Sequence, residues 1–171
     1  MQITELCFMS IKEASDLIAC GELSPTDLVD AHLNRISQTD DRLNSFITLL
    51  EPQAREAAKI AEIELQAKAP RSPLHGIPIG LKDLYFTKGI RTTMGSSIMG
   101  DFVPDYDATV TTRFQEAGAI ILGKLQMHEF AYGATSENIH TGPAHNPWDT
   151  QRVTGGSSGG SGSSVAAGQV M

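Results

Sequence analysis

The most constraining feature of this 171-residue chain is a strand, a helix and a second strand that follow one another near its middle. In residues 77–84 apolar side chains alternate with others, which is the period of a half-buried strand. We expect a helix from Asp107, as its N-cap, to about Ala117, and a second, buried strand over residues 119–123 after a stop at Gly118. Such units favour parallel strands with helices packed on the sheet faces, so the sequence predicts an α/β fold.

The first 70 residues predict helices instead. Ser10 to Glu13 has the pattern of a capping box, and Ser24 followed by Pro25 is typical of a second helix start. We therefore divide the chain into a helical segment, residues 1–70, and the start of an α/β core, residues 71–171. The other elements expected in the first part are a short strand within residues 43–50 and a helix over residues 52–68.

Composition and charge exclude several classes of protein. Hydrophobic residues make up 40% of the chain, which is enough for a core, and the net charge of −7 without any basic run argues against direct nucleic-acid binding. Cys7 and Cys20 form no metal-binding or disulfide pattern. Because residues 1–6 lack a signal-peptide pattern and no stretch has membrane-spanning length, we expect a cytoplasmic protein without a membrane partner.

The segment Gly155–Ser164 consists only of glycine and serine. Alone it would be interpreted as a flexible linker, and a glycine-rich loop before a helix also resembles a phosphate cradle. However, the turn-like Asn146–Asp149 precedes it and a helix start at Val165–Gly168 follows it, which a linker does not need. The lysine of a Walker motif is absent as well, so the segment favours serine chemistry over nucleotide binding.

A catalytic serine needs a base. None of the histidines has the context of a serine-hydrolase elbow or a metal motif; they are His32, His75, His128, His140 and His145. Lys82 is the better candidate, since burial among apolar neighbours would lower its pKa; a useful base at pH 7 needs a pKa lowered by about 3, at a cost of about 4 kcal/mol. The strand pattern alone would leave Lys82 on the surface of an edge strand, paired with Asp83 or water; Pro78 requires either an edge or a gap in the hydrogen-bond ladder there.

Taken together, the motifs identify a family resemblance. From about Leu74 onward the chain resembles the amidase signature family, whose members are Ser-cisSer-Lys amidases, and it resembles their N-terminal part only. The stretches that carry the resemblance are His75–Asp83, Asp107–Val110, Gly118–Lys124, Ser136–Asn138, Asn146–Asp149 and Gly155–Ser161. The resemblance implies helices followed by part of a mixed, helix-flanked sheet.

The resemblance also assigns roles to residues. It places Lys82 as the base and Ser157 as the relay serine after a cis peptide bond, 75 residues apart in the sequence (157 − 82). Ser158, Gly155 and Gly156 would support them. The residues it suggests for substrate binding are Gly133, Ala134 and Thr135. No metal and no organic cofactor is implied, and the nucleophilic serine of the family is expected beyond residue 171.

Three functions remain open. The first, favoured by Met127–Phe130, is an amidase that hydrolyses a small-molecule amide through a serine acyl-enzyme. The second is the glutamine-hydrolysing subunit of a tRNA-dependent amidotransferase, in which an aspartate is typical where His128 stands. The third is a non-catalytic remnant, inactive as an isolated chain. A homodimer of the full-length protein is compatible with the first.

Overall fold

The computed structural model describes residues 3–171. Met1 and Gln2 lie outside the described residues; they are the first two of residues 1–6, which lack a signal-peptide pattern. The helices and strands follow one another in an α/β order. They are α1 Ile3–Cys7, α2 Ile11–Ala19, α3 Pro25–Leu43, β1 Phe46–Leu49, α4 Glu51–Ala67, β2 Pro78–Lys82, α5 Thr109–Glu116, β3 Ile120–Leu125, β4 His145–Asn146, β5 Asp149–Val153 and α6 Gly159–Ala166. Short 3₁₀ turns occur at Ser97–Met99 and Glu129–Ala131.

The main sheet is mixed, in the order β1-β3-β2. β2 runs parallel to β3 and β1 antiparallel to it. This confirms the parallel pair predicted from the strand–helix–strand pattern and the mixed sheet implied by the family resemblance. β2 is an edge strand of this sheet, where the missing N–H of Pro78 costs no ladder bond. The carbonyl of Pro78 accepts a bond from the backbone N–H of Met171 instead.

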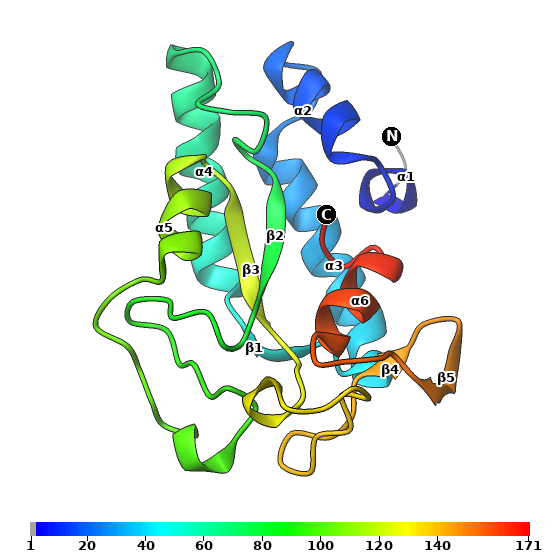
Figure 1. Cartoon of the computed structure of the whole chain (residues 1–171). Helices are drawn as coiled ribbons and strands as arrows, with labels where there is room; N and C mark the ends of the chain where they lie inside the picture. The colour runs from blue at the N-terminus through cyan, green and yellow to red at the C-terminus, as the bar shows by residue number, and fades with distance from the viewer. Residues whose placement is uncertain (1–2) are drawn as a thin grey trace.

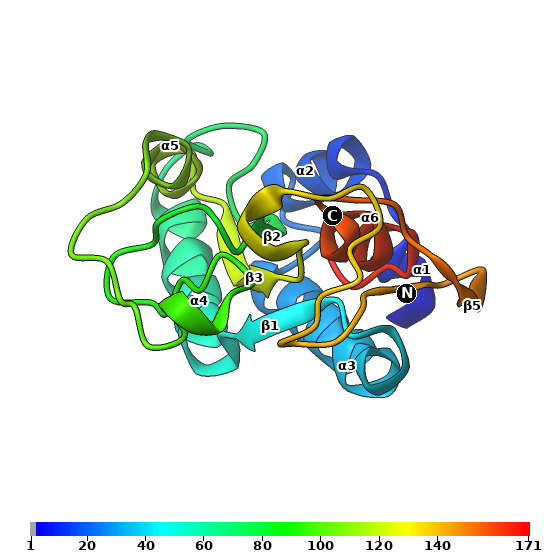
Figure 2. The same ribbon diagram turned by 60° about the horizontal axis from the view of Figure 1, so that its bottom comes forward.

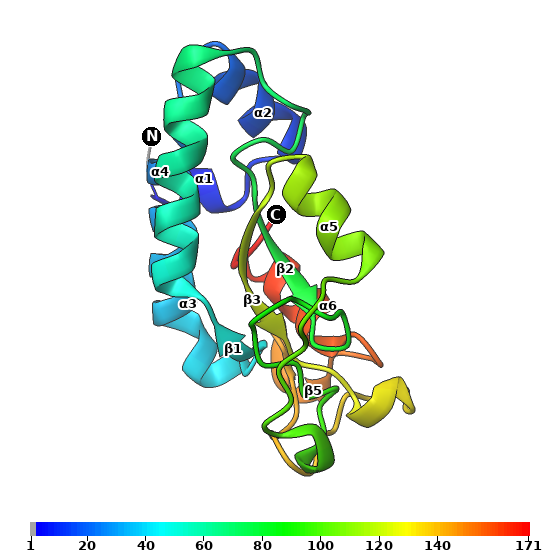
Figure 3. The same ribbon diagram turned by 90° about the vertical axis from the view of Figure 1, so that its left-hand side faces the viewer.

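Helices cover the sheet on both faces. The long helices α3 and α4 lie on one face and α5 on the other, which is clearest from the side (Figure 3), and α6 packs beside β2 (Figure 1). The buried alanine stripe of α4 allows a close approach to β3 and α3; its members are Ala54, Ala58 and Ala61. The structure does not test the division of the chain at residue 70, which stays a prediction.

The helix starts show where local sequence was sufficient. Ser10 and Glu13 form the predicted capping box, and Ser24 caps α3 with Pro25 in its first turn. The predicted cap of α5 was wrong: the helix begins at Thr109 after Ala108, without a side-chain cap. The carboxylate of Asp107 instead accepts a bond from the backbone N–H of Lys88, 2.7 Å away. A tertiary contact therefore outcompetes the local cap.

A second correction concerns the glycine and serine run. We expected its helix to start at Val165, but α6 starts at Gly159 and ends at Ala166. Before it, β4 and β5 form a hairpin around the predicted turn at Pro147 and Trp148. Tertiary packing decides the helix, because glycine lowers helix propensity throughout this segment.

Candidate active site

The end of β2 presents Lys82 beside Ser157, the third residue of the Gly155–Ser164 segment. Both parallel strands finish at the same end of the sheet, where Lys82 is paired in register with Leu125. The connections that leave β2 and β3 gather there (Figure 2). Gly80 is required in β2, since a Cβ at this position would lie 2.6 Å from the Leu125 side chain.

Three glycines of the Gly155–Ser164 segment, Gly156, Gly159 and Gly160, pack closely against neighbouring parts of the chain. A Cβ on Gly160 would lie 2.5 Å from the backbone of Gln126 and of Ser45. Gly156 and Gly159 pack equally closely on Ser136, whose hydroxyl accepts a bond of 2.9 Å from the N–H of Gly159. This part of the chain is a docked loop and helix, not a linker.

Lys82 and Ser157 meet near the start of the Gly155–Ser164 segment, just before α6. The peptide bond between Gly156 and Ser157 is cis, as the resemblance implies. Nζ of Lys82 donates to Oγ of Ser157 over 2.6 Å, and the carbonyl of Ser157 accepts a bond of 3.0 Å from the N–H of His128. Partial burial lowers the pKa of Lys82 below its ordinary value. Among residues 3–171 no carboxylate forms an ion pair with Lys82.

A buried ion pair lies directly behind Lys82, and sequence reasoning missed it. The side chains of Asp83 and Lys124 are fully buried, with Nζ of Lys124 3.5 Å from Oδ1 of Asp83. The same Nζ donates to Oγ1 of Thr92 at 2.7 Å and to the carbonyl of Tyr85 at 2.8 Å. The available signal was Lys124 itself, because a lysine inside a buried apolar strand needs a partner.

Asp83 in turn holds the segment that follows β2. Its Oδ2 accepts two bonds from Thr93, one from the backbone N–H at 2.8 Å and one from the hydroxyl at 2.5 Å. Its Oδ1 has no hydrogen-bond donor, so the 3.5 Å contact with Lys124 compensates that oxygen by charge rather than by a short bond. Burial lowers the pKa of Lys124, and the Asp83 carboxylate opposes that change.

The segment from 128 to 140 encloses the loop from the other side. Of Gly133, Ala134 and Thr135, Ala134 lies close to the Ser157 loop: its backbone would be 3.0 Å from a Cβ on Gly156. Ser158 is exposed and Gly155 half-buried. The support and substrate-binding roles predicted for these residues stay predictions.

Buried polar residues hold this segment in place. Nδ2 of Asn138 donates to the carbonyls of Gly95 and Met127, at 2.7 and 2.9 Å. Oε1 of Glu129 accepts from the Ser96 hydroxyl at 2.6 Å and lies 2.9 Å from Nε2 of His140. The Ser96 hydroxyl first, and His140 with it, lowers the pKa of Glu129.

Four of the five histidines lie in other surroundings, whereas His128 contacts Ser157 through its backbone N–H. His75 contacts Glu64, His140 contacts Glu129, and Nδ1 of His145 lies 2.9 Å from the carbonyl of Thr150. His32 is fully buried against the C-terminal segment. Within residues 3–171 no group of three histidine, cysteine or acidic side chains could hold a metal ion, and no helix is both long and apolar enough to cross a membrane.

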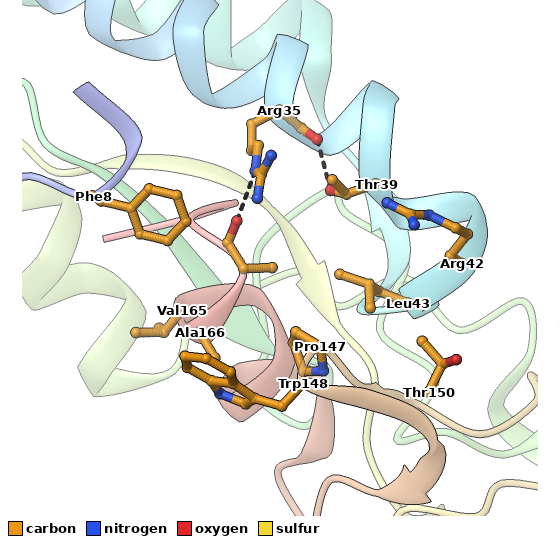
Figure 4. Close-up of a pocket in the computed structure, with 11 residues that line it drawn as sticks. Phe8, Arg35, Thr39, Arg42, Leu43, Pro147, Trp148, Thr150, Val165 and Ala166 are labelled. Carbon is orange, nitrogen blue, oxygen red and sulfur yellow. Dashed lines mark hydrogen bonds between the residues drawn. The ribbon is translucent and has the colours of Figure 1, made fainter. Parts of the chain in front are cut away.

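A groove of about 550 Å³ lies away from this site. Figure 4 shows Phe8, Val165 and Trp148 along it, with Arg35 reaching across to the backbone carbonyl of Ala167 over 2.8 Å. Neither Lys82 nor Ser157 lines the groove. The chemistry of the side chains, not the size of the hollow, therefore marks the candidate site.

The family model described as amidase matches residues 27–171. This chain belongs to the amidase family. It is 49% identical to a glutamyl-tRNA(Gln) amidotransferase subunit from Anaeromyxobacter dehalogenans (strain 2CP-C), over 97% of this chain and 34% of that protein.

Two solved structures resemble it as well. A crystal structure of an amidase matches with a TM-score of 0.88 and 40% sequence identity. The match covers 95% of this chain and 37% of the amidase chain. A glutamyl-tRNA(Gln) amidotransferase subunit from Thermotoga maritima has a TM-score of 0.77 at 32% identity and covers 96% and 33%. The chain therefore matches the N-terminal part of the amidase fold and spans about a third of the length of these relatives.

Proposed function

We propose that this chain supplies the base, Lys82, and the relay serine, Ser157, of a protein that hydrolyses the C–N bond of a carboxylic amide. The hydrogen bond of 2.6 Å between Nζ of Lys82 and Oγ of Ser157 carries the proposal. The nucleophilic serine would come from the remaining part of the parent polypeptide, since the chain spans 34% of its A. dehalogenans relative.

The reaction proceeds by acyl transfer. Neutral Lys82 takes the proton of Ser157 Oγ, which takes the proton of the nucleophilic serine as its oxygen attacks the amide carbonyl. The tetrahedral intermediate collapses, the C–N bond breaks, and the proton returns through Ser157 to the leaving nitrogen. Water then hydrolyses the acyl-enzyme through the same relay and regenerates the free serine.

Within the family, we propose the glutamine-hydrolysing subunit of a tRNA-dependent amidotransferase. The 49% identity to a protein with that description supports this choice, and it reverses the order that Met127–Phe130 favoured in the sequence. Given the net charge of −7, we expect a partner subunit to provide most of the contact with tRNA. The protein would act in the cytoplasm, without a metal or organic cofactor.

A small-amide hydrolase is the second candidate. The amidase crystal structure is more similar to this chain than the Thermotoga protein is, both in identity and in TM-score. His128, rather than an aspartate, also favours it. This candidate would need no partner subunit, and a homodimer would suffice.

One set of experiments separates the candidates and tests the relay. Ammonia release by the full-length parent protein is measured with glutamine and with simple aliphatic amides, before and after removal of any copurifying subunit. Glutamine hydrolysis that depends on the copurifying protein supports the amidotransferase; turnover of simple amides by the protein alone contradicts it.

Variants of the same protein test the chemistry. Lys82→Ala and Ser157→Ala should each abolish turnover of either substrate class. Lys88→Ala, on an exposed lysine, and Ser161→Ala, in the same glycine and serine run, serve as matched controls that retain it. Near-normal rates for Lys82→Ala or Ser157→Ala would disprove the relay.

A further inference from the structure

The Asp83–Lys124 pair is an unusual use of charge for a strand interior. Both side chains are fully buried, and replacing such a pair by apolar residues of similar volume is often neutral or stabilising. Fold stability alone therefore does not account for the pair. Its location suggests another role, because Asp83 directly follows Lys82 in the sequence.

The hydrogen bonds of the pair converge on the end of β2. Lys124 faces Leu81 in the register of β2 and β3, one step before Lys82 faces Leu125. The backbone N–H of Asp83 donates to the carbonyl of Leu125 at 3.1 Å, and its carbonyl accepts from Met94 at 3.2 Å. The residue after Lys82 is thus held through its backbone and its carboxylate at once.

Lys124 completes this anchorage from β3. Its ammonium group has three N–H donors, and three acceptors surround it: the Tyr85 carbonyl, the Thr92 hydroxyl and the Asp83 carboxylate. Tyr85 and Thr92 both belong to the connection that follows β2. Removing Lys124 would release that connection and the end of β2. The side chain of Lys82 would then no longer be held in its orientation toward Ser157.

The charges matter as much as the contacts. In residues 3–171 the side chain that bonds Nζ of Lys82 is the neutral Ser157, and no carboxylate pairs with it. The charged groups behind it are Asp83, the first residue after β2, and Lys124 on the neighbouring strand β3. An uncompensated Asp83 would favour the charged form of Lys82, whereas an uncompensated Lys124 would oppose it.

On the basis of the proposed function, we propose that Asp83 and Lys124 are positioning residues for the Lys82–Ser157 relay. They fix the strand end that carries the base, and they cancel each other's charge so that neither one biases the base. Neither residue touches the substrate.

The test uses the pH dependence of kcat/KM in the full-length parent protein. Its acidic limb reports the loss of the proton from Lys82. Lys124→Met should move this limb to higher pH and Asp83→Asn to lower pH, each by about half a pH unit for a charge beyond the contact shell. The double variant Asp83→Asn/Lys124→Met should return the limb to its original position.

The split between kcat and KM tests the anchorage. We expect Lys124→Met and the neutral change Thr92→Val to lower kcat by about tenfold or more, with KM within about twofold, because displacement of a base affects the chemical step. Leu33→Ala, in the α3 core, is the matched control: it destabilises the fold without touching the relay and should leave both constants near normal.

The outcomes distinguish this inference from the proposed function. If Lys82→Ala abolishes activity while Lys124→Met and Asp83→Asn shift the acidic limb in the same direction, or not at all, the positioning role is wrong and the relay stands. If Lys82→Ala retains activity, the relay itself fails. If Lys124→Met does not fold, the other two variants still test the positioning role. The proposal requires the acidic limb to lie at lower pH in Asp83→Asn and at its original pH in the double variant.

Discussion

Lys82 and Lys124 occupy neighbouring positions on paired parallel strands, yet their surroundings differ in kind. Lys82 is partly exposed at a sheet edge, and its Nζ meets a neutral hydroxyl. Lys124 is fully buried and its Nζ meets a carboxylate, a carbonyl and a hydroxyl.

Burial lowers the pKa of both lysines, but only Lys124 has a carboxylate that opposes the change. The difference shows how one sheet can hold one lysine that is suited to lose its proton and another that is suited to keep it. The partner, more than the depth of burial, separates the two roles.

The largest effect should come from removing Lys82, the proposed base. Lys82→Met should lower amide turnover in the full-length protein by about 10³-fold or more, within the range of general-base contributions. The free energy of unfolding should not fall at neutral pH, because partial burial disfavours the charged lysine in the folded state. The small gain in stability from removing this charge is present below the pKa of Lys82 in the folded protein. It vanishes as the pH rises past the ordinary lysine pKa of 10.5. Steady-state kinetics and denaturation at several pH values check both.

The next largest effect is expected on stability: removing Lys124, unlike removing Lys82, should lower the free energy of unfolding. Lys124→Met leaves the Asp83 carboxylate buried without its partner, so it should cost about 3–5 kcal/mol of folding free energy. Lys12→Met breaks only an exposed ion pair with Asp16 and should cost less than about 0.5 kcal/mol. Urea unfolding measures both. A loss for Lys124→Met no larger than for Lys12→Met would contradict the contrast between a structural Lys124 and the proposed base, Lys82.

Acid should weaken the part of the core that holds α3 to the last residues. His32 is buried against Gly168 and Gln169, neither ring nitrogen has a well-formed hydrogen bond, and burial lowers its pKa to about 4. The unfolded chain therefore binds a proton first, and stability should be lost as the pH falls from about 6.5 to 4, by about 3 kcal/mol.

The corresponding variant removes that dependence. His32→Gln should flatten the pH dependence of unfolding in this window, whatever its effect at pH 7. An unchanged slope between pH 6.5 and 4 would assign the acid sensitivity to other groups.

The smallest effect tests how firmly the segment that carries Ser157, the proposed relay serine, is held. Gly160→Ala introduces a Cβ 2.5 Å from the backbone of Ser45 and Gln126 and should cost about 1–3 kcal/mol. Gly162→Ala lies in the same helix with nothing within 4 Å and should stabilise by up to about 1 kcal/mol. Thermal unfolding distinguishes them; similar values would mean that the loop is not docked.

Local signals were enough for much of the fold. The capping box at Ser10 and the cap and proline at Ser24–Pro25 set their helices without distant partners. The alternation around Lys82 and the apolar run before Lys124 predicted two strands, and the helix between them predicted their parallel pairing. These signals act within a few residues, so they can be recognised in the sequence without knowledge of the fold.

Signals that depend on distant partners were not readable in the same way. The carboxylate of Asp107 accepts a bond from Lys88 rather than capping its own helix. At the start of α6, Ser136 and Gln126 accept bonds from the backbone N–H groups of Gly159 and Gly160. The contact of Lys82 with Ser157 was expected from the family resemblance, not from the strand pattern, which allowed a surface lysine.

Local sequence was therefore enough to predict α2 to α5, strand β1, the parallel pair of β2 and β3, and the family to which the chain belongs. Tertiary structure decided which lysine meets a hydroxyl and which meets a carboxylate, because the two partners come from segments 75 and 41 residues away from Lys82 and Lys124 (157 − 82 and 124 − 83). The pKa of an amine depends on the groups that folding brings around it, and no local pattern specifies those groups.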